Sequence, residues 1–340
     1  MKIYWQDTFN FISKLTISRI VNVAKLLGSY QLTKWTKKPI VWGQPMTVSF
    51  EPTTACNLRC PECPSGLRSF SRETGNLKKG FFTKSIDEIA NKLLYLIFYF
   101  QGEPFINPDF LNMVSYAHKK GLYTITSTNG HFLSKDICKK IIDSKLDRII
   151  ISVDGTTQET YEVYRKGGEL QKILDGTKNL IEVKKKMKSS TPHIIYQFLV
   201  VKPNEHQIED LYTLANELGV DEVKLKTAQI YNYKKGNPLI PSIDKYSRYR
   251  KVEDNSYVIK NELLSHCWKL WHACVITWNG IVVPCCFDKD ADHKLGNLQN
   301  SSFKNIWKGK TYNNYRKRLL TGRQNIEICK NCTEGCKVWA

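Results

Sequence analysis

Residues 56–63 read Cys56-Asn57-Leu58-Arg59-Cys60-Pro61-Glu62-Cys63, with three cysteines at spacings of four and three residues. An apolar, β-prone run, residues 46–50, leads directly into them. Three thiolates on one short loop can bind three irons of a [4Fe-4S] cluster, which leaves the fourth iron without a protein ligand. A small molecule can bind and react at such an open position on a metal.

Three other interpretations of this stretch are weaker. The cysteines would share one face of a helix, but Pro61 and Pro64 argue against a helix because proline breaks a helix interior. A zinc site usually takes four ligands from paired Cys-x-x-Cys units, and no fourth ligand lies nearby in the sequence. Disulfides need an oxidising compartment, and no export signal is visible.

The motif Cys-x3-Cys-x2-Cys after a first strand resembles the signature of the radical S-adenosylmethionine (SAM) enzymes. The resemblance implies a [4Fe-4S] cluster on Cys56, Cys60 and Cys63, with SAM chelated to the open iron through its amine and carboxylate. Glu62 stands where the family usually has an aromatic residue that stacks on the adenine. In pattern, the resemblance covers about residues 46–336.

Strand-like and helix-like runs alternate from Met46 to about Ile230. The strand-like runs are 46–53, 95–101, 122–128, 147–153, 193–201 and 222–230. The helix-like runs are 84–94, 109–119, 134–144, 169–187 and 205–217. This alternation predicts an α/β fold with a parallel sheet, which right-handed crossovers would curl toward a barrel. The resemblance implies an open, partial (β/α)6 TIM-like barrel, whose active site lies at the C-terminal ends of the strands.

The second predicted strand ends in Gln101-Gly102-Glu103-Pro104. Glycine permits a close backbone approach, and the Glu103 carboxylate is an acceptor for an ammonium group. At this position the four residues resemble the family's Gly-Glu-Pro motif, which implies that they bind the methionyl amine of SAM. The alternative is an ordinary turn, because glycine and proline are common in turns.

Polar residues follow the next predicted strands, and Asn129, Ser152 and Asp154 suit the hydrogen bonds of a ribose. Turn formation is the alternative for Asn129 and Asp154, since each precedes a glycine. By position, Ser152 resembles the family's ribose-contacting serine, and Arg165 resembles the arginine that binds the SAM carboxylate. Leu199 stands where it can flank the adenine. Solvent exposure of Arg165 and core packing of Leu199 are the alternatives.

Residues 263–340 contain seven of the eleven cysteines. Trp278-Asn279-Gly280 predicts a hairpin turn, and the spacing from Cys267 to Cys285 resembles the opening of SPASM/twitch domains. That resemblance implies an auxiliary [4Fe-4S] cluster, for which the predicted ligands are Cys267, Cys285, Cys329 and Cys332. The short series that ends at Cys336 favours a single auxiliary cluster. Zinc is the alternative metal, and ligation by Cys274, Cys286 and Cys336 is left open.

Residues 1–45 have apolar residues at helical spacing with lysines and an arginine between them, from Trp5 and Phe9 to Leu27. Gly28 and Ser29 are predicted to end this amphipathic helix. It either packs on the catalytic domain, which we favour, or lies on a membrane surface. No apolar stretch is long enough to span a bilayer, and no signal peptide is clear, so we expect a cytoplasmic protein.

The formal net charge of +19 over 340 residues raises the question of an anionic partner. The lysines are scattered along helices of surface type, and no recognised nucleic-acid module is present, which argues against nucleic-acid binding.

Eleven cysteines in short-spaced sets favour metal ligation over disulfides. Tyrosines and lysines between 231 and 262 predict a surface linker rather than a platform for a nucleobase.

The sequence therefore predicts an amphipathic N-terminal segment (1–45), a radical SAM barrel (46–230), a connector (231–262) and an auxiliary cluster domain (263–340). The family resemblance implies reductive cleavage of SAM to a 5′-deoxyadenosyl radical, which takes a hydrogen atom from a peptide, protein or small-molecule substrate. An electron donor such as flavodoxin or ferredoxin is implied, and no further catalytic residue is identified. The alternatives are an iron–sulfur electron-transfer or binding protein that cleaves no SAM, and a basic RNA-modifying enzyme. Glu103 and the open iron argue against the electron carrier, which needs all four irons ligated.

Overall fold

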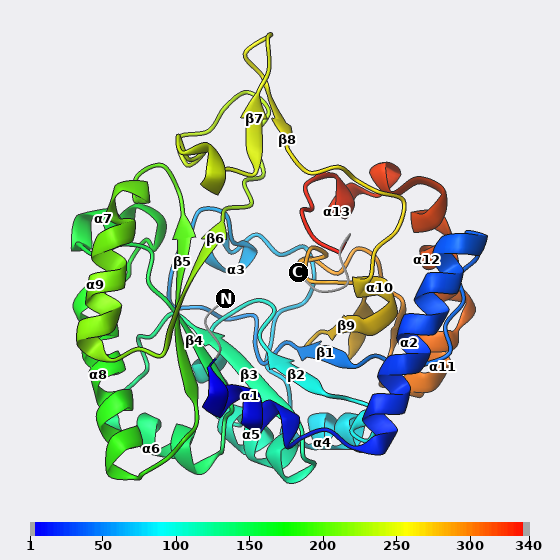
Figure 1. Ribbon diagram of the computed structural model, residues 1–340, viewed down its shortest axis with the longest axis horizontal. Coiled ribbons are helices and arrows are strands. Elements are labelled where there is room, and N and C mark those ends of the chain that lie inside the picture. Colours follow the sequence, from blue (N-terminus) through cyan, green and yellow to red (C-terminus); the bar gives the residue numbers. More distant parts are fainter. Residues whose placement is uncertain (1–3, 336–340) are drawn as a thin grey trace. The chain divides into compact units, whose positions relative to one another are not determined.

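The computed structural model describes residues 4–335, which form two compact units (Figure 1). Among these residues, the first unit contains the chain up to Ala55, Phe70–Thr124 and the chain from Glu262 onward. The second unit contains Cys56–Ser69 and Ile125–Asn261. Both units are discontinuous in the sequence, and the four consecutive segments predicted above remain a prediction about domain organisation.

Five strands of the first unit pair in the order β11-β10-β9-β1-β2. Their bounds are β1 (Thr47–Phe50), β2 (Tyr95–Phe98), β9 (Ala273–Ile276), β10 (Ile281–Val283) and β11 (Gly296–Asn297). β1 has two parallel partners, because Val48 is in register with Leu96 of β2 and with Cys274 of β9. β10 and β11 continue the sheet with antiparallel pairing. The cysteine-rich segment thus extends the sheet that begins with the first strand.

The core of the first unit is aromatic. Alternate residues of β1 and β2 are buried, as expected for strands that present one face to a core. The ring of Phe82 packs on Phe50 and on Phe98, with centroids 5.2 and 5.3 Å apart, and Phe98 also packs on Phe110. Apart from its two N-terminal helices, the helices and 3-10 turns of this unit are α4 (Lys79–Ile89), η1 (Pro104–Ile106), α5 (Phe110–Lys119), α10 (Lys269–His272), α11 (Phe303–Lys308), α12 (Lys310–Gly322), η4 (Arg323–Asn325) and α13 (Glu327–Lys330).

The second unit is built on four parallel strands in sequence order, of which β3 begins in the first unit. They are β3 (Tyr123–Thr128), β4 (Arg148–Ser152), β5 (His193–Val200) and β6 (Glu222–Thr227). The residues Ile149–Ser152 are all buried, which is typical of a strand covered on both faces. The helices are α3 (Pro64–Leu67), α6 (Lys135–Asp143), α7 (Gln158–Tyr164), α8 (Leu170–Lys186) and α9 (Ile208–Leu218), with a 3-10 turn η2 (Glu205–Gln207) before α9.

The predicted α/β class and its six strands are confirmed, with parallel pairing around β1 and from β3 to β6. The helix predicted over 84–94 is shifted, since α4 spans Lys79–Ile89. Its predicted end is wrong because the backbone amides of Leu94 and Tyr95 both donate to the carbonyl of Met46, which places these residues beside the first strand. The short helix α7 was not predicted.

The N-terminal segment forms two helices, α1 (Trp5–Ile12) and α2 (Ile17–Thr36), rather than one. The predicted end at Gly28 and Ser29 is wrong, because α2 continues through both residues. A β-carbon at Gly28 would lie 3.3 Å from the ring of Trp42, so the glycine permits close packing there. Thr16 caps α2 by accepting the amide of Arg19, and Lys37 ends it in the left-handed conformation.

The predicted connector forms a two-stranded antiparallel ribbon of β7 (Tyr249–Lys251) and β8 (Tyr257–Ile259), preceded by η3 (Asp244–Tyr246). Figure 1 shows this ribbon in yellow. Tyr249 is buried and its hydroxyl bonds the backbone of Ile230. The prediction of a surface linker is therefore wrong at Tyr249, which is part of the buried core.

Candidate functional site

Hydrogen bonds to backbone groups and one close backbone contact fix the loop of the three cysteines. The amide of Arg59 donates to the carbonyl of Lys166 at 3.0 Å, and the guanidinium of Arg68 donates to the carbonyl of Cys56 at 2.6 Å. A β-carbon at Gly66 in α3 would lie 2.5 Å from the amide nitrogen of Cys60, so only glycine fits there. The path of the loop is set by close backbone packing.

Donor groups surround the sulfurs of this loop. The amide of Leu58 lies 3.4 Å from Cys56 Sγ, and Asn129 Nδ2 lies 3.9 Å from the same atom. Arg165 Nη1 lies 3.9 Å from Cys60 Sγ. Burial raises the pKa of the Cys60 thiol to about 11, against the opposing effect of Arg165, so metal ligation must displace its proton. Amide donors and a cation beside the sulfurs suit thiolates on an iron–sulfur cluster.

Arg165 is fixed by Asp154 next to Cys60. Its Nε donates to Asp154 Oδ2 at 2.5 Å, and Asp154 Oδ1 accepts the amide of Leu199 at 2.7 Å. Burial lowers the pKa of Arg165, but Asp154 and Cys60 raise it more, so the guanidinium stays charged. The structure thus joins three predicted site residues from three segments of the second unit into one hydrogen-bonded group. Their predicted contacts with SAM remain predictions.

His131 orients Asn129 and was missed by the sequence analysis. The amide of Glu169 donates to His131 Nε2 at 2.9 Å, so Nδ1 carries the ring proton and faces the oxygens of Asn129 at 3.1 Å. Burial lowers the pKa of His131, in keeping with a neutral ring. With its oxygen placed in this way, Asn129 donates through Nδ2 to Asn57 Oδ1 at 2.7 Å. The only sequence signal was the position of His131 directly after Asn129-Gly130.

Glu62 has a structural partner that the sequence did not indicate. Its carboxylate accepts the backbone amide of Tyr231 at 2.9 Å. Nearby, Tyr249 belongs to the same buried apolar cluster as Cys60 and stacks on Tyr233, with ring centroids 4.4 Å apart. The beginning of the predicted connector therefore packs on the cysteine loop within the second unit.

The residues Gln101–Pro104 follow β2 in the first unit. Gly102 has φ +74°, and a β-carbon there would clash with the carbonyl of Thr53. The amide of Glu103 donates to the carbonyl of Ala55 at 2.7 Å, and its buried carboxylate caps η1 by accepting the amide of Phe105. The close backbone approach expected of Gly102 is thus present. The last predicted residue, Ser152, is buried at the end of β4.

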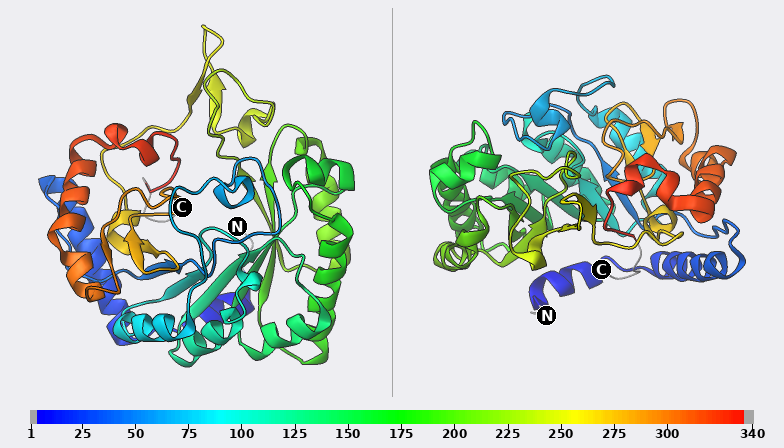
Figure 2. Two further views of the ribbon diagram at one scale, coloured as in Figure 1. Left: turned by 180° about the vertical axis from the view of Figure 1, so that it is seen from behind. Right: turned by 90° about the horizontal axis from the view of Figure 1, so that it is seen from above.

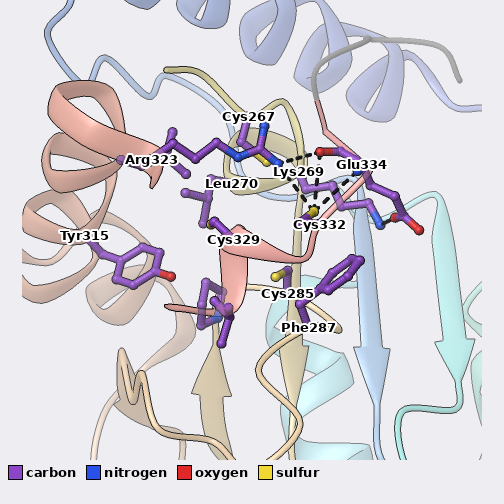
Figure 3. Close-up of a pocket in the computed structure, with 13 residues that line it drawn as sticks. Cys267, Lys269, Leu270, Cys285, Phe287, Tyr315, Arg323, Cys329, Cys332 and Glu334 are labelled. Atoms are coloured by element: carbon purple, nitrogen blue, oxygen red, sulfur yellow. Dashed lines mark hydrogen bonds and ion pairs between the residues drawn. The ribbon is translucent and has the colours of Figure 1, made fainter. Parts of the chain in front are cut away.

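The four cysteines predicted to hold an auxiliary cluster line one pocket of the first unit (Figure 3). Cys267 precedes α10, Cys285 follows β10, and Cys329 and Cys332 come from α13 and the residues after it. Cys267, Cys329 and Cys332 are buried, and Cys285 is partly buried. Cysteines that are more than sixty positions apart in the sequence therefore converge on one enclosed space.

Two cations reach this pocket, and neither was predicted. Arg323 is fully buried and donates through Nη2 to Cys332 Sγ at 3.4 Å and to the carbonyl of Glu334 at 2.7 Å (Figure 3). Lys269 pairs with Glu334 and lies 3.8 Å from Cys286 Sγ. Burial lowers the pKa of Lys269, but Cys286 and Glu334 raise it more, so the ammonium stays charged. A guanidinium beside Cys332 suits a group that carries negative charge on its sulfurs.

The described cysteines Cys138, Cys274 and Cys286 do not line this pocket. Cys274 is buried on β9 and Cys138 on α6, and burial raises the pKa of each thiol. Cys286 is exposed, and Cys336 lies outside the described residues. Between residues 4 and 335, no three side chains of His, Cys, Asp or Glu gather closely enough to hold a single metal ion.

Comparison with known proteins identifies two domains. Residues 50–215 match the family model of the radical SAM superfamily, and residues 267–333 match that of SPASM, an iron–sulfur cluster-binding domain. The chain is 25% identical to the tungsten-containing aldehyde ferredoxin oxidoreductase cofactor-modifying protein of Pyrococcus furiosus, over 83% of this chain and 86% of that protein. It is 24% identical to PqqA peptide cyclase of Gluconobacter oxydans, over 77% of this chain and 76% of the cyclase.

The fold is similar to that of SuiB from Streptococcus suis, solved with bound SAM. The TM-score is 0.63 at 15% sequence identity, and the match covers 91% of this chain and 76% of SuiB. SuiB has also been solved with its precursor peptide SuiA. The predicted radical SAM and SPASM resemblances are thus confirmed, and with them the [4Fe-4S] cluster, SAM and auxiliary iron–sulfur chemistry of these domains.

Proposed function

Because the chain belongs to the radical SAM superfamily and carries a SPASM iron–sulfur domain, we propose that it abstracts a hydrogen atom from a peptide substrate. The observation that carries the proposal is the group of Cys56, Cys60, Asn129 and Arg165 in the second unit, where donors and a fixed cation face the cysteine sulfurs. When bound, the cluster and SAM supply the radical chemistry: one electron from a reductant cleaves SAM to methionine and a 5′-deoxyadenosyl radical, which takes a hydrogen atom from the substrate.

The chain's own residues bind and orient these groups. Cys56, Cys60 and Cys63 hold the cluster through three irons. Arg165, fixed by Asp154, places a positive charge beside the cluster where it can bind the SAM carboxylate. Asn129 and Ser152 provide polar contacts for the nucleoside, and Leu199 provides an apolar one. The electron donor is of the flavodoxin or ferredoxin class.

In this proposal, the pocket lined by Cys267, Cys285, Cys329 and Cys332 holds one auxiliary [4Fe-4S] cluster. Its ligands are Cys267, Cys285, Cys329 and Cys332, which all line the same pocket. Four thiolates complete the coordination of a four-iron cluster, so this cluster has no open iron for SAM. Its role is to accept an electron from the substrate radical or to anchor the substrate.

The peptide class of substrate rests on the relatives. PqqA peptide cyclase is named for a peptide, and SuiB has been solved with a precursor peptide bound. The test is anaerobic incubation with SAM, dithionite and candidate peptides deuterated at single carbons. We expect deuterium to appear in 5′-deoxyadenosine for one labelled position, together with a mass change of that peptide. If only small-molecule substrates transfer deuterium, the peptide assignment is wrong while the radical chemistry stands.

Glu103 is the proposed acceptor for the methionyl ammonium, and its two functions can be separated. Glu103→Gln keeps an oxygen to cap η1 but removes the charge, whereas Glu103→Ala removes both. Losing a charge-assisted hydrogen bond costs on the order of 1.5–3 kcal/mol, so both variants should bind SAM roughly tenfold to a hundredfold more weakly. Calorimetry measures the affinity, with iron content unchanged as the control. Wild-type affinity in Glu103→Gln would remove Glu103 from the SAM site.

A further inference from the structure

The N-terminal helices expose large apolar side chains along one face. In α1, Trp5, Phe9 and Ile12 are 62%, 62% and 49% exposed at spacings of four and three residues. In α2 the exposed residues are Ile17 (83%), Ile20 (53%), Val21 (45%) and Trp35 (85%), which also recur at helical spacing. Figure 2 (right) shows the two helices, in dark blue, running one after the other. We call these seven residues the apolar face.

The opposite side of α2 is polar and is used to dock the helix. Arg19 is buried and donates to the carbonyls of Lys14, Ala90, Lys120 and Gly121 at 2.6–3.1 Å. Asn22, also buried, donates to the carbonyls of Gln44 and Lys92 and accepts the amide of Gln44. An ordinary surface helix buries its apolar side and exposes its polar side. This helix does the reverse in its first two turns, so core packing does not account for its exposed isoleucines.

The helix α1 is also fixed with its apolar residues outward. The ring of Phe11 packs on Tyr95 and Tyr123, with centroids 5.1 and 5.5 Å apart, and Asp7 is hydrogen-bonded to the hydroxyl of Tyr123. Trp5 and Phe9 stack on each other at 5.9 Å on the exposed side. The apolar face is therefore held in place by contacts on the other side of both helices.

The exposed charges of the N-terminal segment have one sign. Asp7 is the sole acidic residue among the first fifty, and it is buried against Tyr123. The same stretch contains seven lysines and arginines. Among the described residues of this stretch, five lysines are exposed or partly exposed: Lys14, Lys25, Lys34, Lys37 and Lys38. An apolar face with tryptophans, whose own segment exposes cations, has the chemistry of a helix that lies in the interface of an anionic membrane.

We propose that α1 and α2 bind the surface of a bilayer that contains anionic lipids. The apolar face enters the boundary between headgroups and acyl chains, and the lysines stay among the lipid phosphates. Among residues 4–335, no helix is long and apolar enough to cross a bilayer, so the helices lie on the surface. A second copy of the chain could also cover an apolar face, but a symmetric interface would bring the lysines of both copies together without acidic partners nearby in this segment.

The test compares two triple variants that leave the net charge unchanged. Phe9→Ser, Ile20→Ser and Trp35→Ser replace three of the seven residues of the apolar face. The matched control, Met187→Ser, Tyr212→Ser and Ile243→Ser, alters apolar residues of 36–43% exposure away from the N-terminal helices. Co-sedimentation uses vesicles of phosphatidylcholine alone and with about a third phosphatidylglycerol. Circular dichroism and gel filtration with light scattering confirm folding and report the oligomeric state.

Wild type and the control should sediment with the anionic vesicles, bind neutral vesicles weakly, and be released in part by salt, which screens the lysines. The N-terminal triple variant should bind the anionic vesicles at least about a hundredfold more weakly, because three side chains no longer leave water. Absence of wild-type binding, or equal binding by the two variants, would overturn the proposal. So would a wild-type dimer that the N-terminal variant loses while vesicles bind neither protein.

Discussion

Replacing Cys56, Cys60 and Cys63 by alanine is expected to abolish the formation of 5′-deoxyadenosine from SAM and dithionite. These residues provide the only proposed cluster site with an open iron, so their loss leaves SAM without a metal that can bind and reduce it. A second variant replaces Cys329 and Cys332 in the pocket of the first unit. It keeps the open iron and should still cleave SAM in the absence of substrate, although turnover of the true substrate is lost.

Iron content decides whether the two variants can be compared. Reconstituted wild type should contain about eight irons and each variant about four, as expected for two four-iron clusters. Metal ligation can hold a small domain folded, so the second variant needs spectroscopic proof that its remaining cluster is intact. If a loaded second variant makes no 5′-deoxyadenosine while the first still does, the radical-generating site has been assigned to the wrong cysteines.

Glu51→Ala is expected to destabilise the first unit strongly. Glu51, directly after β1, is fully buried and forms two hydrogen bonds with the guanidinium of Arg72, at 2.8 and 2.5 Å. Its carboxylate also accepts the amide of Trp278 in the turn between β9 and β10. Removing the carboxylate leaves the buried guanidinium of Arg72 without its charged partner, which costs about 3–5 kcal/mol. Anaerobic urea unfolding measures the change in the free energy of unfolding.

An exposed ion pair gives the matched control for this prediction. Glu182 pairs with Lys135 at 3.3 Å, and both side chains are more than half exposed. Glu182→Ala should change the free energy of unfolding by less than about 1 kcal/mol, because solvent screens the pair. A loss in Glu51→Ala as small as that of the control would show that the Glu51–Arg72 pair contributes little to stability.

The local patterns of the chain predict its elements well, and its long-range pairing less so. Alternation of apolar runs was sufficient to find the strands β1–β6, since periodicity reports the burial of each segment. No local pattern shows that β9 pairs with β1, because that pairing depends on residues such as Val48 and Cys274 from opposite ends of the chain. Gly28 did not end α2 because packing on Trp42 outweighs the weak helix propensity of glycine.

In the candidate sites, too, the residues with a local sequence pattern were predicted, and those defined by long-range contacts were not. Cysteines are predictable because metal ligation requires particular spacings, and the four cysteines proposed for the auxiliary cluster do line one pocket. The contacts of His131, Glu62 and Arg323 were missed because each residue bonds a partner far along the chain. These partners are the backbone amides of Glu169 and Tyr231 and the carbonyl of His266. Arginine and glutamate are common surface residues, so their type alone carries no signal for such contacts.

The packing of Gly66 against Cys60 bears on how the first cluster is assembled. The loop is ordered by Arg68, by the amide of Arg59 and by this backbone contact, none of which uses a cysteine sulfur. Binding a ligand to a loop that is already ordered loses little conformational entropy, so more of the binding free energy is retained as affinity. A side chain at position 66 would therefore weaken the affinity of the loop for iron without touching any ligand atom, through a loss of preorganisation.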